Sequence, residues 1–350
     1  ASDLEKYLSD KQVSLQANIE TYTENITGKS SKKDVETLFE MVYGSFHTLR
    51  ANQTAFESYK QRYIAQTKNY YNNPLAIVAD SIAQVEHNNH PLLRNLRVED
   101  IEQVDYMHSM QLYKQRFANA ADFTFVVVGD IDEATLEPLL ETYVASLRAN
   151  KKREKVKKSS PLVTPGKKKV LFTLPMQQPA TIVYLNTFNP LSPSDEDLDY
   201  LLLDDILKLV YAEKIREEQG GTYGVGTYMM VDDLPSRHVV FSVTFSTDVD
   251  KVATLLPIIY QELGLLAKEG PREEDLQKVK EYLRKRYADM QNDNDYWVAR
   301  IQDTQNKGKD AMATYLERLE KVSAKDIQNA ARKILESPNF KEMVSVGIPQ

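Results

Sequence analysis

The sequence predicts an α+β fold of two repeated domains, each with a mostly antiparallel sheet and helices packed on one face. Three observations lead to this prediction: strand-like segments come in pairs before helices, the same order of elements occurs twice, and a lysine-rich stretch separates the two copies. A chain of 350 residues exceeds what one hydrophobic core usually serves, which agrees with two domains. A doubly wound parallel fold agrees less well, because its strands would alternate with helices.

A basic segment divides the chain. Residues 148–169 read RANKKREKVKKSSPLVTPGKKK, a polar run with prolines that cannot bury a core. We therefore predict a first domain at 1–150, a basic linker at 151–169 and a second domain at 170–350. A nucleic-acid or membrane patch is the alternative interpretation of these lysines. It is disfavoured because aromatic residues are not interleaved and the chain carries a net charge of −7.

The internal repeat is visible in elements that follow one another in the same order. A charged helix carries an Arg-Tyr pair in each copy, at Arg62–Tyr63 and at Arg286–Tyr287. An asparagine-containing turn and a second helix follow each pair. A helix start and then a strand that ends in glycine come next. In the first copy the helix start is at Val98 and the strand is Phe123–Gly129. In the second copy the helix start is at Val322 and the strand is Lys341–Gly347.

The second copy has an opening section that the first copy lacks. β-Branched and aromatic residues predict a pair of strands at Val170–Leu174 and Thr181–Thr187. Ser194 is predicted to cap a long helix with Asp195 and Asp197 in its first turn. The buried stripe of this helix is predicted to be Leu198, Leu201, Leu202, Ile206, Leu209 and Val210. Two further strands are predicted at Tyr223–Met230 and Val239–Ser246.

The first copy starts at Val13–Thr23, which corresponds to the strands after that long helix. Its opening strands and helix have no counterpart in the sequence. Because strands need partners to be stable, we infer that the chain is a piece of a longer protein, cut at its N-terminal end.

No complete catalytic centre can be assembled from the sequence. Cysteine is absent, which excludes disulfides, zinc–thiolate sites and thiol nucleophiles. The close pair His87 and His90 lies in a polar turn that we interpret as a solvated loop, and His47 and His108 lie on predicted helices without a matched acid. The sequence has no H-x-x-E-H or H-E-x-x-H string, no G-x-S-x-G and no phosphate-binding loop. No apolar run is long enough to span a bilayer.

The most informative segment joins the long helix to the next strand. It reads KIREEQGGTYGV over residues 214–225, and Gly220 or Gly221 is expected to be the left-handed residue that ends the helix. The strand would then start close to the helix end, so Arg216 and Tyr223 are predicted to project near the same turn. A guanidinium and a phenol hydroxyl placed in this way could donate hydrogen bonds to a polarised carbonyl or to a tetrahedral oxyanion.

This R-E-x-x-G-x-x-Y segment after a long helix resembles the C-terminal half of the pitrilysin–insulysin family of zinc peptidases, the inverzincins, and the resemblance extends over the entire chain. It implies a metallohydrolase-like fold of the pitrilysin and mitochondrial processing peptidase type, with the late part of the third family domain followed by the whole fourth domain. The zinc-binding H-x-x-E-H of the family lies in its first domain, so the resemblance places zinc in the parent protein and no metal ligand in this chain. It also implies that Arg216 and Tyr223 bind the backbone of a substrate across from the zinc.

The function implied by the resemblance is that of a non-catalytic, substrate-binding half of a zinc metalloendopeptidase acting on peptides or unfolded polypeptides. Its partners would be the substrate and the missing zinc-bearing N-terminal half, and the chain alone is expected to be inactive. Neither nucleic acid nor a membrane span is expected, and a homodimer is left open. A non-catalytic scaffold and a partner subunit of a peptidase-like complex are the alternatives. The cytoplasm and the bacterial periplasm are both compatible with the sequence.

Overall fold

The chain folds into two compact units. A computed structural model describes residues 2–47, 49–150, 153–154, 163–175, 181–194, 196–217 and 224–348. Unit 1 comprises Ala1–Tyr70, Leu96–Lys157 and Asn294–Gly308, and unit 2 comprises Tyr71–Asn95, Lys158–Asp293 and Lys309–Gln350. Each unit therefore contains one segment from the other half of the sequence.

The exchanged segments are equivalent elements of the predicted repeat. In the first half α4 (Pro74–His87) follows α3 (Gln53–Tyr71), and in the second half α11 (Asn294–Lys307) follows α10 (Glu273–Met290). α4 belongs to unit 2, whereas α11 belongs to unit 1. The compact units are defined in space, and each combines segments from both sides of the basic linker. The predicted domain boundaries refer to positions along the sequence, so they stay a prediction.

Unit 1 contains a two-stranded antiparallel sheet with a helix against it. The strands β1 (Val13–Ile19) and β2 (Glu24–Ser30) pair along their whole length, and α2 (Val35–His47) packs against both. The strand start predicted at Val13 is confirmed. The remaining elements of this unit are α1 (Ser2–Leu8), η1 (Lys32–Asp34), α3, α5 (Val98–Glu102), α6 (Tyr106–Arg116), η2 (Ala120–Asp122), α7 (Glu133–Leu139), η3 (Leu140–Val144) and α11.

Unit 2 is built on a five-stranded sheet in the order β3-β7-β4-β6-β5. The strands are β3 (Lys167–Pro175), β4 (Thr181–Pro190), β5 (Val225–Asp232), β6 (His238–Thr247) and β7 (Asn339–Ile348). β3 and β7 are parallel, and every other neighbouring pair is antiparallel, so the predicted α+β class with a mostly antiparallel sheet is confirmed. The predicted pairing of the first two strands with each other is wrong, because β7 lies between β3 and β4 and bonds to both.

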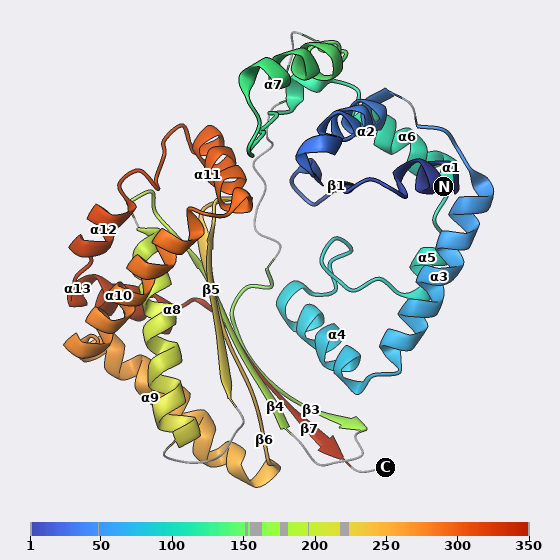
Figure 1. Ribbon diagram of the computed structural model, residues 1–350. Coiled ribbons are helices and arrows are strands. Elements are labelled where there is room, and N and C mark those ends of the chain that lie inside the picture. Colours follow the sequence, from blue (N-terminus) through green and yellow to red (C-terminus); the bar gives the residue numbers. More distant parts are fainter. Residues whose placement is uncertain are drawn as a thin grey trace. The chain divides into compact units, whose positions relative to one another are not determined.

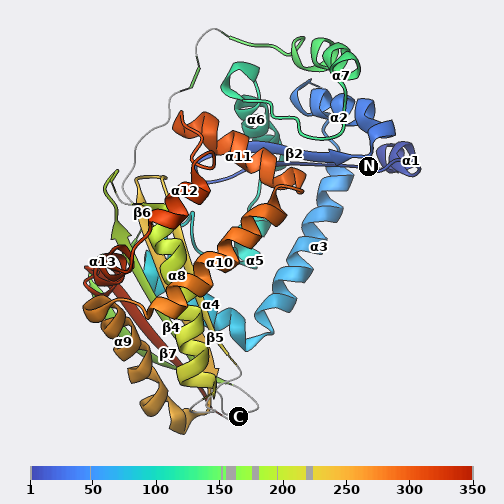
Figure 2. The same ribbon diagram turned by 60° about the vertical axis from the view of Figure 1, so that its left-hand side comes forward.

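Helices cover both faces of this sheet (Figure 1). α8 (Asp197–Tyr211), α9 (Val252–Glu269) and α13 (Ala324–Leu335) lie on one face, and α10 packs against α8 (Figures 1 and 2). On the other face α4 contacts β3 and β7. The predicted helical layer is therefore present, and α4 from the first half adds a helix on the opposite face. The shorter elements of the unit are η4 (Ala212–Glu217), η5 (Val249–Lys251) and α12 (Tyr315–Lys321).

The strand predicted at Phe123–Gly129 does not form. Its counterpart in the second copy, β7, is held by β3 on one side and β4 on the other. The described residues of the first copy include no equivalent of β3 and β4, so this extended backbone has no ladder to join. Phe123 packs against Phe117 instead, with 5.3 Å between the ring centroids.

One helix start is built in the same way in both copies. The backbone N–H of Arg97 donates to the carboxylate of Asp100 at 2.8 Å, which caps α5. The backbone N–H of Ser323 donates to Asp326 at 2.8 Å, which caps α13. Each bond satisfies a donor beside the helix end, and the shared arrangement supports the predicted repeat.

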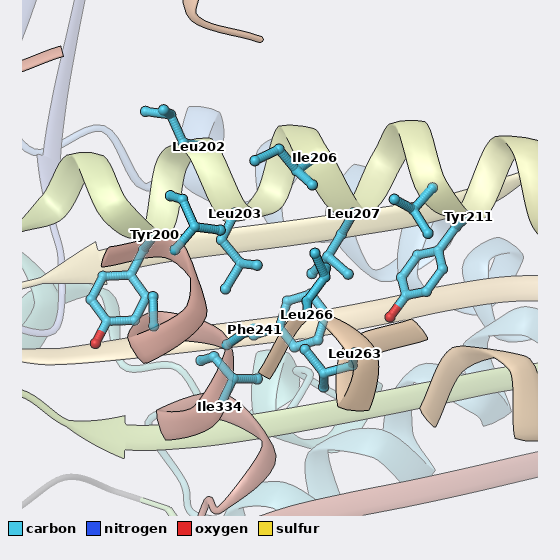
Figure 3. Packing of buried hydrophobic residues seen from close by; sticks show 14 of the residues in the cluster. Tyr200, Leu202, Leu203, Ile206, Leu207, Tyr211, Phe241, Leu263, Leu266 and Ile334 are labelled. Atoms are coloured by element: carbon cyan, nitrogen blue, oxygen red, sulfur yellow. The ribbon is translucent and has the colours of Figure 1, made fainter. Parts of the chain in front are cut away.

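α8 is the centre of the hydrophobic core. Figure 3 shows Leu203, Leu207 and Tyr211 pointing to one side of the helix, while Leu202 points to the opposite side. All four side chains are completely buried, because the sheet and its helices pack on one side of α8 and α10 packs elsewhere on its surface. The predicted stripe is largely confirmed: Leu198, Leu202, Ile206 and Val210 are buried, and Leu201 and Leu209 are partly buried.

The predicted cap of α8 is wrong. The helix begins at Asp197 and its N-cap residue is Glu196, whose side chain makes no capping bond. Ser194 precedes the N-cap residue by two positions, and its hydroxyl lies 2.8 Å from that of Ser192. Asp195 lies outside the described residues. Asp197 still places an acid in the first turn, where the helix dipole favours it.

Removing the Leu203 side chain should destabilise unit 2 strongly. Leu203→Ala leaves a cavity in a fully buried site, and we expect the free energy of unfolding to fall by about 3–5 kcal/mol. Leu171→Ala is the matched control, since Leu171 is 71% exposed on β3 and should cost about 0.5 kcal/mol or less. Urea unfolding followed by circular dichroism measures both values. Equal losses for the two variants would contradict the position assigned to α8.

Candidate functional site

The predicted corner follows directly from the buried helix. α8 continues into η4, where Ile215 is completely buried and holds the segment on the core. Glu213 of η4 accepts a hydrogen bond from the guanidinium of Arg272 at 2.7 Å. This hydrogen bond from Arg272 lowers the pKa of the Glu213 carboxyl. The end of the α8–η4 helix is thus fixed by one apolar contact and one ion pair.

Of the predicted site residues, the structure describes only the backbone of Arg216, which lies in η4 directly after Ile215. Its side chain lies outside the described residues, as do Gly220, Gly221 and Tyr223. The predicted convergence of the guanidinium and the phenol therefore stays a prediction. The described backbone on either side of this segment belongs to η4 and to β5.

The strand after the corner is an edge of the sheet. β5 begins at Val225 and has β6 as its neighbour in the five-stranded order. The side chains of Val225 and Met229 face the helices and pack against the core. On the other face Tyr228 and Met230 are 53% and 40% exposed. The corner is therefore followed by a strand with one paired side and two exposed apolar side chains.

A group of hydrogen-bonded polar side chains that the sequence did not predict lies between α4 and the sheet of unit 2. The amide of Asn186 on β4 donates to the carboxylate of Glu86 in the last turn of α4. The same amide donates to the hydroxyl of Tyr184 at 2.9 Å. The backbone N–H of Thr164 donates to the carbonyl of Glu86 at 2.6 Å. Glu86 therefore binds α4 to β4 through its side chain and to the segment before β3 through its backbone.

The electrostatics of this group follow from its burial. Burial raises the pKa of the Glu86 carboxyl, although hydrogen bonding by Tyr184 and the charge of His87 oppose the shift. Burial also raises the pKa of Tyr184 above its usual range. Lys341 is only 3% exposed, and burial lowers the pKa of its ammonium group, which donates to the carbonyl of Gly166. The network contains one carboxyl and one ammonium group, and both are largely buried.

A cavity of about 130 Å³ opens beside this network. Its walls are formed by Glu86, His87, Val163, Asn186, Phe188, Val240, Asn339 and Lys341. The interpretation of His87 as part of a solvated turn is wrong, because it is the last residue of α4 and its Nε2 lies 3.6 Å from the carboxylate of Glu86. No local sequence pattern could have found this group, since its members come from segments about 100 residues or more apart and meet only through the exchange of α4.

The described residues do not fit a zinc site. Within them no group of three or more His, Asp or Glu side chains could hold a metal ion. The two adjacent acids of α8, Asp204 and Asp205, share the ammonium of Lys208 at 2.7 and 2.9 Å. None of the described helices is long and apolar enough to cross a bilayer.

The comparison with known families agrees with the fold. Residues 108–283, just over half of the chain, match the family described as "Peptidase M16 inactive domain". The match begins in α6, crosses the basic linker and ends in α10, so it includes the helix-to-strand corner.

Individual relatives are of two lengths. Over 284 residues the chain is 24% identical to "Zinc protease PQQL-like" of Arabidopsis thaliana, covering 77% of the chain and 30% of that protein. The fold matches the periplasmic protease PqqL from Escherichia coli with a TM-score of 0.81 and 17% identity, over 100% of the chain and 39% of that protein. It matches the peptidase M16 inactive domain from Pseudomonas fluorescens with a TM-score of 0.75 and 15% identity, over 100% of the chain and 83% of that protein. The chain thus spans about a third of the first two proteins and most of the third.

Glu86 should give the folded chain a measurable pH dependence. Burial raises the pKa of this carboxyl, so the folded state holds its proton more tightly than the unfolded state does. The free energy of unfolding should therefore fall as Glu86 deprotonates above its ordinary pKa of 4.5. Glu86→Gln keeps the size of the side chain and carries no charge. We expect this variant to gain stability relative to the wild type between pH 4.5 and about pH 7.

Urea unfolding at both pH values measures the difference. Glu281→Gln, at an exposed position of α10, is the matched control and should show the same difference from the wild type at both pH values. A relative loss of stability by Glu86→Gln at the higher pH would show that the charged carboxylate is favoured in the folded state, contrary to this prediction.

Proposed function

The chain belongs to the peptidase M16 inactive-domain family, and from this premise we propose that it is the non-catalytic, substrate-holding half of a zinc metalloendopeptidase. The proposed substrates are peptides or unfolded polypeptides. Zinc would be held by an N-terminal half that this chain does not contain, in keeping with relatives named as zinc proteases that are about three times as long. The contribution of this chain would be to bind and orient the substrate backbone.

The observation that carries the proposal is the position of the R-E-x-x-G-x-x-Y segment between a buried helix and an edge strand. We assign Arg216 and Tyr223 as donors of hydrogen bonds to substrate carbonyls. The backbone of Arg216 directly follows the buried Ile215, which limits the movement of the helix end from which its side chain projects. Groups held on rigid elements lose less entropy on binding, which suits a site that recognises backbone rather than side chains.

Relatives of two lengths bear on two arrangements of the complete peptidase. The proteins from Arabidopsis thaliana and Escherichia coli are about three times as long as the chain, which favours a zinc-bearing half in the same polypeptide. The second candidate is a separate partner subunit; the solved Pseudomonas fluorescens chain, described as a domain, is similar in length to this chain and is compatible with either arrangement. The gene sequence upstream of Ala1 distinguishes them: H-x-x-E-H in the same reading frame supports the first arrangement, and its absence there supports the second.

Substitutions at the two donors test the binding role. Arg216→Ala should weaken binding of an unstructured fluorescent peptide about 10- to 100-fold, because a charge-assisted hydrogen bond is lost. Tyr223→Phe removes only the hydroxyl and should weaken binding about 2- to 10-fold. Fluorescence anisotropy measures both affinities. Arg286→Ala and Tyr282→Phe, at exposed positions of α10, are the matched controls and should bind like the wild type. Unchanged affinity in both donor variants would refute the assigned roles.

The isolated chain should not hydrolyse peptides. The described residues contain no group of ligands for a metal ion, and the proposed donors can only hold a substrate. Incubation of the purified chain with an unstructured peptide, followed by mass spectrometry, should show the intact peptide alone. Cleavage that persists after chelator treatment and disappears in Arg216→Ala would contradict the division of roles between two halves.

A further inference from the structure

We propose that the edge of β5 that no described strand pairs accepts an extended peptide as an additional strand of the sheet. This inference rests on the proposed function and specifies where the peptide lies. The edge of β5 offers a row of backbone N–H and C=O groups that a neighbouring strand would pair, since β6 is its partner on the other side. The ligand chemistry that complements such a row is another extended polypeptide backbone.

The geometry of β5 suits strand addition. The pairing with β6 runs without a bulge from Val225↔Phe245 to Asp232↔His238. The strand contains no proline, and its eight residues extend over roughly 25 Å. A regular, unbent edge of this length can pair with a peptide of similar length, whereas bulges and prolines usually prevent such pairing.

The two edges of the sheet differ in charge. β3, at the other edge, opens with Lys167, Lys168 and Lys169, all exposed, and α4 contacts this strand. Edge lysines and covering elements are devices that keep strands from pairing with other chains. β5 carries no charged residue from Val225 to Val231. Within the described part of the chain, one edge is therefore protected in the manner usual for monomeric proteins, and the other is not.

The exposed side chains beside this edge indicate the class of peptide. Gly226, Tyr228 and Met230 lie together on the outer face of β5, and the Tyr228 hydroxyl lies 2.9 Å from the sulfur of Met230. A peptide strand paired with β5 would place every second side chain next to these residues. Apolar or aromatic side chains at alternate positions would bury the exposed ring and thioether, so we expect a preference for peptides with that pattern.

A peptide fits this edge better than a second copy of the chain does. The chain carries a net charge of −7, and equal charges oppose the association of two copies. β5 also begins two residues after Tyr223 in the sequence. Because the proposed function assigns Tyr223 to a peptide substrate, this proximity in sequence also favours a peptide as the ligand of β5.

Amide hydrogen exchange of the full chain tests the proposal directly. The probe is a synthetic peptide of about ten residues with Val or Tyr at alternate positions and Ser or Lys between them. Saturating peptide should slow exchange at amides of β5, while the amides of β3 keep their rates. An analogue that is N-methylated at alternate residues should bind at least about tenfold more weakly, because it lacks N–H donors for pairing with β5.

Substitution at the edge gives an independent readout. Met230→Lys introduces the kind of charge that protects β3 and should weaken binding about tenfold. Leu171→Lys, on β3, is the matched control and should leave binding unchanged, since Leu171 is 71% exposed at the opposite edge. Circular dichroism confirms that both variants are folded.

The outcomes separate this proposal from the proposed function. Peptide binding with slowed exchange at β3 or elsewhere, but not at β5, overturns the edge assignment and leaves the substrate-holding role intact. Absence of any peptide binding overturns both. Slowed exchange at β5 that depends on protein concentration without peptide shows that the edge serves a second copy of the chain, which also overturns the proposal.

Discussion

Burial of α8 on opposite sides is the constraint on which the second unit depends. Leu203 and Leu207 pack on one side and Leu202 on the other, so the helix can neither rotate nor slide without opening a cavity. Ile215 extends this burial into η4. The position of the helix end is therefore set by the core, and the segment that leads to β5 starts from a fixed point. The binding corner proposed at this end would need little ordering when a ligand arrives.

The sequence was sufficient for the elements whose signals are local. The charged helix α10 and the long helix α8 were predicted from periodicity, and the strands β5 and β6 from alternation. Each of these patterns depends only on residues that are close together in the sequence. The position of β7 was missed because its pairing joins residues more than 150 positions apart. Phe123–Gly129 shows the converse error: its composition favours a strand, but a strand needs neighbours to pair with, and the described part of the first copy contains no equivalent of β3 and β4, which hold β7 in the second copy.

The candidate site divides in the same way. Arg216 and Tyr223 were proposed from a short motif and from the family that this motif resembles, and the family match includes their positions. The context of that motif could not be predicted, because only the strand order shows that the following strand is an edge. Glu86 and Lys341 carried no local signal at all. Their meeting depends on the placement of α4, which belongs to the first copy in sequence and to the second unit in space.

Because α4 and α11 are exchanged, neither copy of the repeat is a self-sufficient folding module. A gene fragment that ends in the basic linker would separate α4 from the sheet that it covers and would leave Asn186 without the carboxylate that it binds. Shortening one copy therefore damages the other. Sequence changes in either copy are tolerated only while that copy still accommodates the helix that it receives. The surface residues of the two copies are therefore expected to diverge faster than the residues that contact α4 and α11.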